Sequence, residues 1–229
     1  CVSFYLSLHK LEASDTYITI EAPSSAQFVE QRSRFIAFAW PVSDVSEVKQ
    51  HLEHLQKEYY DARHICYAYM LQPDRSVWRA NDNGEPSGTA GRPILGQINS
   101  CRLTNILIAV VRYFGGVKLG TGGLTEAYRR AAQAAIEKAS VTTRYVEKKL
   151  QVLFNYAVVN DVMRIAKEFD LRISDQDYGI FRAEGTEQTF ECCTLFVARK
   201  LNVESAYECL QRLAATAVPV TLLLSAAGG

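Results

Sequence analysis

Two glycine-rich stretches contain most of the residues in this chain that could bind a ligand. The first is NDNGEPSGTAGRP at residues 81–93, and the second is GGVKLGTGG at residues 115–123. From Gly84 to Gly123 the chain carries nine of its thirteen glycines. Glycine tolerates positive φ and lets the backbone approach other groups closely, so such loops present free N–H groups. The ligand that they predict is an anion such as a phosphate or a carboxylate.

The second stretch lies between a predicted strand and a predicted helix. An apolar, mostly β-branched run occupies residues 106–111, and a helical pattern begins at Leu124. Thr121 stands where a P-loop needs lysine, and the glycine spacing differs from the dinucleotide-binding fingerprint. One alternative is that the glycines only permit a tight turn. Because Lys118 lies inside the loop and a helix start attracts negative charge, anion binding is favoured.

The candidate nucleic-acid or anion-binding residues combine both stretches with the basic and polar side chains around them. The cations are expected to contact phosphates, the glycine-rich backbone to donate N–H groups, and Tyr113 or Phe114 to stack on a base. Phe114 continues a buried strand, so the core is the stronger expectation for its ring. The set is Arg63, His64, Arg79, Asp82, Gly84, Glu85, Ser87, Gly88, Thr89, Arg92, Arg112, Tyr113, Gly115, Gly116, Lys118, Gly120, Thr121, Gly122 and Gly123.

Composition places the chain among globular proteins with balanced charge. It has 229 residues, 48% of them hydrophobic, with 25 basic residues against 25 acidic ones. Residues 92–130 hold six Arg or Lys against Glu126 alone, which predicts either one basic zone or cations spread over several faces. No run approaches the roughly 20 apolar residues of a membrane span, and the first residues lack a secretory signal pattern. A cytoplasmic protein is therefore expected.

Cysteine and histidine usage shows no metal or redox motif. The six cysteines form no C-x-x-C pair and are expected to be free thiols in a reducing compartment, with Cys66 buried. His51 and His54 are three residues apart on a predicted helix and could hold a metal, but a solvated polar face is favoured. His64 is expected to be a hydrogen-bonded structural residue more than a catalytic base. No cofactor and no metal are predicted.

Two α+β domains are predicted, at residues 25–142 and 148–226, after an unassigned segment at residues 1–24. Hairpins and helices around one sheet are expected in the first domain. Its predicted elements are a hairpin at residues 26–40, a helix after Ser43 or Asp44, a hairpin at 60–80, a helix at 93–100, a strand at 106–111 and a helix from Leu124 to about Ala139.

The second domain has a different order of elements. The pattern predicts strands at 150–156, 171–177, 189–198 and 218–224, with helices at 159–169 and 203–214. This βαββαβ order is ferredoxin-like. No residue in it suggests catalysis, so it is either an interaction surface, such as an RNA-contacting sheet, or a structural appendage.

Four separated motifs resemble the IMPACT family in their order and spacing. They are SRF at 33–35, DARHICYAY at 61–69, DNGEPSGTAGRPIL at 82–95 and VVRYFGGVKLGTGGL at 110–124. The resemblance covers nearly all of the chain beyond the first two dozen residues. The sequence departs from the family at Asn83, where many members have Asp, and at Glu126, where a basic residue is common. A carboxylate in the first turn of this helix would repel a bound anion.

The resemblance implies both a fold and a biological setting. The first domain is expected to be similar to the second domain of ribosomal protein S-five, and the second to a ferredoxin-like domain of elongation factor G. Both of those relatives work on the ribosome. Eukaryotic members of the family restrain a starvation-sensing kinase that acts on translation initiation, whereas the activity of bacterial members is not settled.

The predicted function is that of a non-enzymatic RNA- or ribosome-associated protein that modulates translation. One alternative is an enzyme acting on a phosphorylated small molecule or nucleotide, in which Asp82, Glu85 and His64 would supply metal-binding and base roles. A second alternative is a protein-binding regulator of a translation or stress factor. The expected partners are RNA or the ribosome, or a protein of translation control, and no membrane.

Overall fold

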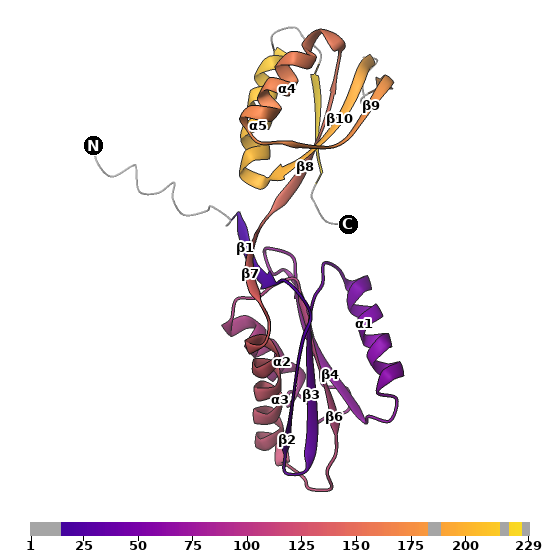
Figure 1. Ribbon diagram of the computed structural model, residues 1–229, viewed down its shortest axis with the longest axis vertical. Helices are drawn as coiled ribbons and strands as arrows, with labels where there is room; N and C mark the ends of the chain where they lie inside the picture. The colour runs from indigo at the N-terminus through magenta and orange to yellow at the C-terminus, as the bar shows by residue number, and fades with distance from the viewer. Residues whose placement is uncertain (1–14, 183–188, 216–219, 226–229) are drawn as a thin grey trace, which may run out of the picture. The chain divides into compact units, whose positions relative to one another are not determined.

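The computed structural model describes residues 15–182, 189–215 and 220–225, and the chain divides into two compact units. One unit is Thr16–Arg144, and the other is formed from Tyr145 onward together with Asp15. Each unit has its own antiparallel sheet (Figure 1). Each also has its own hydrophobic core. The predicted two-domain α+β fold is confirmed, while the domain boundaries at 25–142 and 148–226 stay predictions.

A five-stranded antiparallel sheet with the order β2-β3-β6-β4-β5 forms the centre of the first unit. The first hairpin turns at Gln31 and Arg32, which both take positive φ, at 43° and 67°. The strands are β2 (Ser24–Glu30), β3 (Ser33–Pro41), β4 (His64–Leu71), β5 (Val77–Asn81) and β6 (Ile106–Tyr113).

Both faces of the central strand β6 are covered. Ile106, Ile108 and Val110 belong to the core on one face, and the residues between them belong to the cores on the other. Because successive side chains of a strand alternate between faces, Arg112 continues the first set and Tyr113 the second. This alternation decides which site residues can meet.

Helices cover the two faces unequally. α1 (Val45–Glu58) lies on one face, and α2 (Gly91–Ser100) and α3 (Gly120–Glu137) lie on the other (Figure 1). The N-cap of α1 is Asp44, whose Oδ1 accepts hydrogen bonds from the backbone N–H groups of Ser46 and Glu47 at 2.7 and 2.9 Å.

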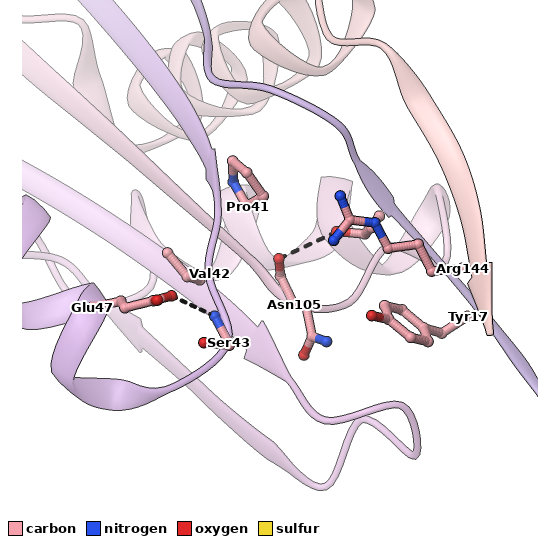
Figure 2. Close-up of a pocket in the computed structure, with 8 residues that line it drawn as sticks. Tyr17, Pro41, Val42, Ser43, Glu47, Asn105 and Arg144 are labelled. Carbon is pink, nitrogen blue, oxygen red and sulfur yellow. Dashed lines mark hydrogen bonds between the residues drawn. The ribbon is translucent and has the colours of Figure 1, made fainter. Parts of the chain in front are cut away.

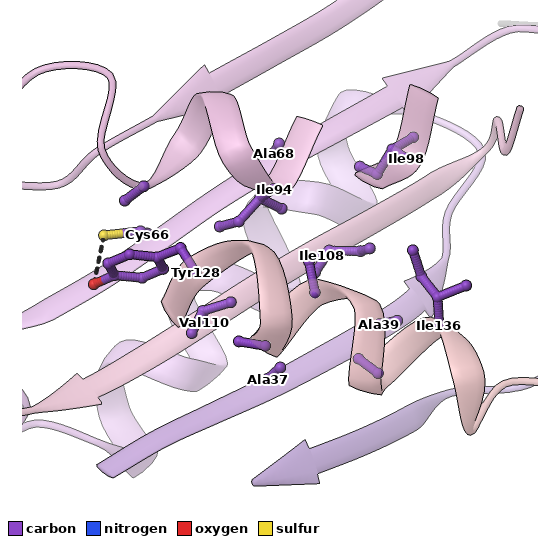
Figure 3. Packing of buried hydrophobic residues seen from close by; sticks show 14 of the residues in the cluster. Ala37, Ala39, Cys66, Ala68, Ile94, Ile98, Ile108, Val110, Tyr128 and Ile136 are labelled. Carbon is purple, nitrogen blue, oxygen red and sulfur yellow. Dashed lines mark hydrogen bonds between the residues drawn. The ribbon is translucent and has the colours of Figure 1, made fainter. Parts of the chain in front are cut away.

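The core under α2 and α3 relies on small residues for close packing. Ala131, Ala132 and Ala135 of α3 are buried, and Tyr128 of the same helix is fully buried. Figure 3 shows α2 and α3 side chains packing onto the small residues of β3 and β4. The α3 helix begins at Gly120, four residues before the predicted start. Gly120 itself has φ +72°, whereas Gly122 and Gly123 lie within the helix and do not extend the loop.

Two short strands were not anticipated. β1 (Thr16–Ile20) and β7 (Val141–Tyr145) form a two-stranded sheet. β1 lies within the segment that the sequence left unassigned, and its Ile20 is fully buried in the core under α2 and α3.

The second unit has the predicted ferredoxin-like topology. Its four strands form an antiparallel sheet in the order β11-β8-β10-β9, which is the order expected for βαββαβ. No helix in the described part of the chain is long and apolar enough to cross a membrane. The elements are β8 (Glu147–Phe154), η1 (Tyr156–Val158), α4 (Val159–Glu168), β9 (Arg172–Arg182), β10 (Thr189–Arg199), α5 (Lys200–Ala215) and β11 (Val220–Ser225).

Candidate functional site

A cavity of about 360 Å³ lies at the N-terminal end of α3 in the first unit. It collects residues from the end of β6, the start of β4, the loop after β5 and the first turn of α3. Seven of its lining residues belong to the predicted binding set. The cavity is lined by Arg63, His64, Glu85, Pro86, Arg112, Phe114, Lys118, Leu119, Gly120, Thr121 and Leu124.

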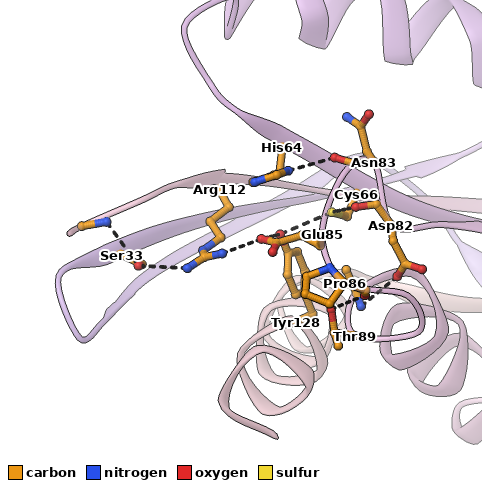
Figure 4. Close-up of polar contacts among 12 residues, drawn as sticks. Ser33, His64, Cys66, Asp82, Asn83, Glu85, Pro86, Thr89, Arg112 and Tyr128 are labelled. Atoms are coloured by element: carbon orange, nitrogen blue, oxygen red, sulfur yellow. Dashed lines mark hydrogen bonds and ion pairs between the residues drawn. The ribbon is translucent and has the colours of Figure 1, made fainter. Parts of the chain in front are cut away.

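A buried ion pair between Arg112 and Glu85 forms part of the cavity wall. Arg112 Nη1 donates to Glu85 Oε1 at 2.6 Å, and the two side chains are only 6% and 4% exposed. Figure 4 shows the two groups pointing toward each other. Arg112 Nη2 lies 3.5 Å from Ser33 Oγ, whereas its buried Nε has no partner among the described residues. Burying either charge alone would be costly, so each residue requires the other.

Two buried side chains extend this pair into the core. The Tyr128 hydroxyl donates to Glu85 Oε1 at 3.0 Å, and the Cys66 thiol lies 3.3 Å from that hydroxyl and 2.9 Å from the Asp82 carbonyl oxygen. Burial raises the pKa of Cys66 to about 12. Burial, followed by the proximity of Cys66 and Glu85, also raises the pKa of Tyr128. Both groups therefore stay protonated near neutral pH, and the hydroxyl keeps a proton to donate to Glu85.

The loop between β5 and α2 is organised around the Asp82 carboxylate. Its Oδ2 accepts from Gly88 N at 2.8 Å, and its Oδ1 accepts from Ala90 N at 3.0 Å and Gly91 N at 2.8 Å. Burial alone would raise the pKa of Asp82, but these three donors and Arg92 outweigh it and hold the pKa below its usual value. The amides of this loop are therefore used by the protein itself.

His64 joins the cavity to this loop. Its Nδ1 lies 2.9 Å from the Asn83 carbonyl oxygen. Gly84 has φ +85°, and a Cβ there would lie 3.3 Å from His64 Nδ1, so the ring and the turn are closely packed. The arrangement matches the hydrogen-bonded structural role expected for this histidine.

The start of α3 leaves its backbone amides open. No side chain among the residues that the structure describes caps the helix, and its first turn contains no acidic residue. A Cβ at Gly120 or Gly122 would meet nothing within 4 Å, so a ligand atom can approach the backbone there. Because the helix begins earlier than predicted, Glu126 does not lie in its first turn, and its carboxylate pairs with Arg129. The expected repulsion of an anion by Glu126 is thus corrected.

Two cations and an aromatic ring complete the cavity. Arg63 and Lys118 are exposed, and neither has an ion-pair partner in the part of the chain that the structure describes. Phe114 is 48% exposed, with the Arg112 guanidinium carbon 5.6 Å from its ring centroid. The expectation that Phe114 lies in the core is therefore wrong. β6 ends at Tyr113, so Phe114 is no longer held between the two covered faces of the sheet.

The other predicted residues lie outside the cavity lining. Arg79, Ser87 and Arg92 are exposed elsewhere in the unit. Tyr113 lies on the opposite sheet face, where its hydroxyl donates to Asp61 Oδ1 at 2.7 Å. Residues used in loop or turn structure, or next to the cavity, are Asp82, Gly84, Gly88, Thr89, Gly115, Gly116, Gly122 and Gly123.

The locally basic run at residues 92–130 is dispersed. Of its six cations, only Arg112 and Lys118 line the cavity. Arg129 pairs with Glu126, and Arg130 pairs with Glu30 at 3.1 Å. Of the two alternatives that the sequence allowed, the structure shows the dispersed arrangement.

Sequence reasoning missed the roles of Ser33, Cys66 and Tyr128. A signal for this cluster was present in the alternation of β6, because an Arg two residues after Val110 continues a buried face. A buried Arg requires an acidic partner. Glu85 lies in the neighbouring glycine-rich loop and could have been proposed from that requirement.

A second cavity of about 290 Å³ lies beside the N-terminus of α1 (Figure 2). Thr19 Oγ1 donates to the Asn105 carbonyl oxygen at 3.2 Å, and Ser43 N donates to Glu47 Oε2 at 2.7 Å. None of the predicted binding residues lines it. Arg144 is the one cation in its lining, so its charge differs from that of the cavity at α3.

Comparisons with known proteins agree with this architecture. The Impact N-terminal domain model matches residues 31–136. The IMPACT family member YvyE of Bacillus subtilis is 31% identical over 163 residues, which cover 71% of this chain and 75% of that protein. The IMPACT family member YigZ of Escherichia coli is 31% identical over 169 residues, covering 73% and 83%.

Solved structures extend the likeness to the whole fold. The crystal structure of a hypothetical protein superposes with a TM-score of 0.67 at 26% identity, covering 93% of this chain and 98% of that one. With two relatives above 30% identity of which this chain covers three quarters or more, the chain belongs to the IMPACT family.

Proposed function

We propose that this protein is a non-enzymatic RNA- or ribosome-associated protein that modulates translation, and that the cavity at the start of α3 contacts RNA. The observation that carries the proposal is the meeting of three features in one cavity. They are two cations without an ion-pair partner among the described residues, the N-terminus of an 18-residue helix that none of those residues caps with its side chain, and a half-exposed aromatic ring. Cations and helix amides bind phosphate, and an aromatic ring stacks on a base.

The acidic residues in and next to the cavity form internal hydrogen bonds, which supports binding over catalysis. Glu85, the one carboxylate of the lining, accepts hydrogen bonds from Arg112 and Tyr128. Asp82, which an enzyme could use as a metal ligand, accepts three backbone hydrogen bonds. Arg63 and Lys118 are exposed in the cavity lining and can contact a ligand. Membership of the IMPACT family, whose eukaryotic members act on translation, supplies the biological setting of the proposal.

The domain assignment is part of this proposal. We take residues 25–142 as the RNA-contacting domain and residues 148–226 as a ferredoxin-like domain that adds an interaction surface. A cytoplasmic location is proposed on the same grounds, because RNA and ribosomes are the expected partners.

The test is binding of the purified full chain to ribosomes and to short single-stranded and structured RNAs over a range of salt concentrations. The logarithm of affinity is expected to fall linearly with the logarithm of salt, and Lys118→Ala is expected to flatten the slope by about one unit. Phe114→Ala is expected to weaken single-stranded RNA binding by about 1–3 kcal/mol with an unchanged slope.

Lys49→Ala is the matched control, because it removes the same charge from the exposed side of α1, across the sheet from the cavity. Its slope is expected to equal that of the unmodified protein. Absence of binding to any RNA at low salt would overturn the proposal. If the salt dependence of affinity had the same slope for both lysine variants, the RNA would contact the protein outside the cavity.

A second candidate is supported by the size of the cavity. A volume of about 360 Å³ lies within the range of small-molecule sites. Saturable, magnesium-dependent binding of a nucleotide without RNA binding would favour an enzyme acting on a phosphorylated small molecule. Recovery of a specific protein partner, with neither RNA nor nucleotide bound, would favour a protein-binding regulator.

A further inference from the structure

We propose that the cavity at the start of α3 recognises a phosphomonoester, as found at the end of an RNA chain, in preference to the internal phosphodiesters of that chain. This inference rests on the proposed function and makes it more specific. It depends on three independent observations: the charge of the cavity lining, the supply of donors and the nature of the walls.

Charge favours a dianion. Three cationic side chains, Arg63, Arg112 and Lys118, line the cavity with one carboxylate, Glu85, which leaves a net charge of +2 with His64 neutral. A phosphomonoester carries about −1.5 to −2 near pH 7, whereas each internal phosphodiester of a nucleic-acid strand carries −1. Glu85 is already paired with Arg112, so the cations of the lining without an ion-pair partner in the described part of the chain are Arg63 and Lys118. Their number matches the charge of a terminal phosphate.

Donor supply favours an anion with several free oxygens. The first turn of α3 offers amides that no side chain of the described segments caps, and Gly120 and Gly122 leave open space where a Cβ would stand. Further donors are independent of the helix, because the exposed side chains of Arg63 and Lys118 line the cavity and have no ion-pair partner within the described residues. Arg112 belongs to the same lining with its side chain 94% buried, and its buried Nε has no partner among those residues either. A phosphomonoester has three non-ester oxygens to accept from these groups, one more than a phosphodiester.

The walls favour a ligand with one apolar part beside the phosphate. Pro86, Leu119 and Leu124 line the cavity together with the half-exposed ring of Phe114. A terminal nucleotide fits this arrangement, because its base can stack on the ring while its phosphate meets the helix. An internal nucleotide would also need a path for a second ester-linked residue through a site of about 360 Å³.

The test compares one short oligoribonucleotide in three forms: 5′-phosphorylated, 3′-phosphorylated and with hydroxyl groups at both ends. Fluorescence anisotropy with the full chain measures the affinity of each. At least one phosphorylated form is expected to bind about tenfold more tightly than the hydroxyl form, since charged hydrogen bonds are gained. Lys118→Ala and Arg63→Ala are each expected to remove most of this preference, and Lys49→Ala to keep it.

Competition identifies the source of the phosphomonoester. Adenosine monophosphate and inorganic phosphate are titrated against the labelled, phosphorylated oligonucleotide. Displacement by adenosine monophosphate at far lower concentration than by phosphate would support a site for a whole nucleotide.

The outcomes separate this inference from the proposed function. Equal affinity for phosphorylated and hydroxyl RNA overturns the inference while RNA binding stands. Binding of adenosine monophosphate, measured directly by titration calorimetry, without any RNA binding supports the phosphomonoester site and overturns the RNA proposal. Binding of none of these probes overturns both.

Discussion

The two glycine-rich segments of the first unit look alike in sequence but use their backbone amides in opposite ways. In the loop after β5, the N–H groups of Gly88, Ala90 and Gly91 all donate to Asp82. At the start of α3, none of the described side chains caps the helix, and Gly120 and Gly122 have open space around them in that part of the chain. Because the Asp82 carboxylate accepts these hydrogen bonds, the amides of the first segment serve to hold the loop in shape. The amides of the second segment meet no such carboxylate among the described residues, so they can donate to a ligand. Glycine content alone does not distinguish the two.

The largest expected effect on stability comes from changing the loop after β5. Glu85→Ala leaves the Arg112 charge buried without its partner and is expected to lower the free energy of unfolding of the first unit by about 3–5 kcal/mol. Thr121→Ala, on the exposed start of α3, is expected to change it by less than about 0.5 kcal/mol. Both tryptophans, Trp40 and Trp78, lie in the first unit, so their fluorescence in urea reports this unit.

The double variant Glu85→Leu with Arg112→Met is the control for the buried pair. With no charge left buried, it is expected to recover most of the stability that Glu85→Ala loses. A loss below about 1 kcal/mol for Glu85→Ala would show that the pair does not support the loop.

Gly115 is the most closely packed glycine of the second segment. A Cβ at this position would lie 2.0 Å from the Arg32 carbonyl oxygen, in the turn between β2 and β3. Gly115→Ala is therefore expected to lower the free energy of unfolding by about 1–3 kcal/mol, because the turn must move. The same tryptophan measurement applies. An unchanged stability would mean that the hairpin adapts freely, and that Gly115 belongs with the open part of the segment.

Protonation of Asp82 at low pH is expected to destabilise the loop after β5. The pKa of Asp82 in the folded protein lies below its usual value, so its ionised form stabilises the fold above the unfolded pKa of about 4. This contribution is lost as pH falls through the folded pKa. Asp82→Asn is therefore expected to be less stable than the unmodified protein at pH 7, with the difference shrinking below about pH 4. Parallel stability curves down to pH 3 would contradict the assigned role of the carboxylate.

A smaller stability effect of opposite sign is expected at Gly122. Gly122 is helical with open space around it, so Gly122→Ala should raise stability by about 0.5–1 kcal/mol. If the helix amides receive a phosphate, the same variant should bind phosphorylated RNA less tightly. Gly91→Ala is the matched change in the loop after β5, and it should destabilise because its Cβ would lie 2.5 Å from Asn81 N. Stabilisation by both changes would remove the distinction between the segments.

Periodicity in the sequence predicted much of the fold. The apolar run at 106–111 indicated the central strand β6, which is buried on both faces of the sheet, and the βαββαβ pattern predicted the topology of the second unit. β1 and β7 escaped notice because each has only five residues and mixes polar with apolar side chains. The start of α3 was placed too late because glycine has a low helix propensity, which tertiary packing overrides here.

The candidate site was predicted only in part, because some of its contacts depend on how distant strands pair. Lys118, Gly120 and Thr121 are adjacent in sequence, so their grouping is visible there. Arg112 and Glu85 are 27 residues apart, and their contact depends on how β6 pairs with β4 and where the loop after β5 returns. Local patterns do not contain that information.

The burial of Cys66 has a practical consequence for measuring motion in the first unit. Its thiol is fully buried between β4 and α3, and the raised pKa of about 12 keeps it protonated in ordinary buffers. An alkylating reagent can therefore reach it only when the core opens. The labelling rate of Cys66, followed by mass spectrometry without denaturant, would report how often that core opens. A ligand that bridges α3 and β6 would slow the labelling.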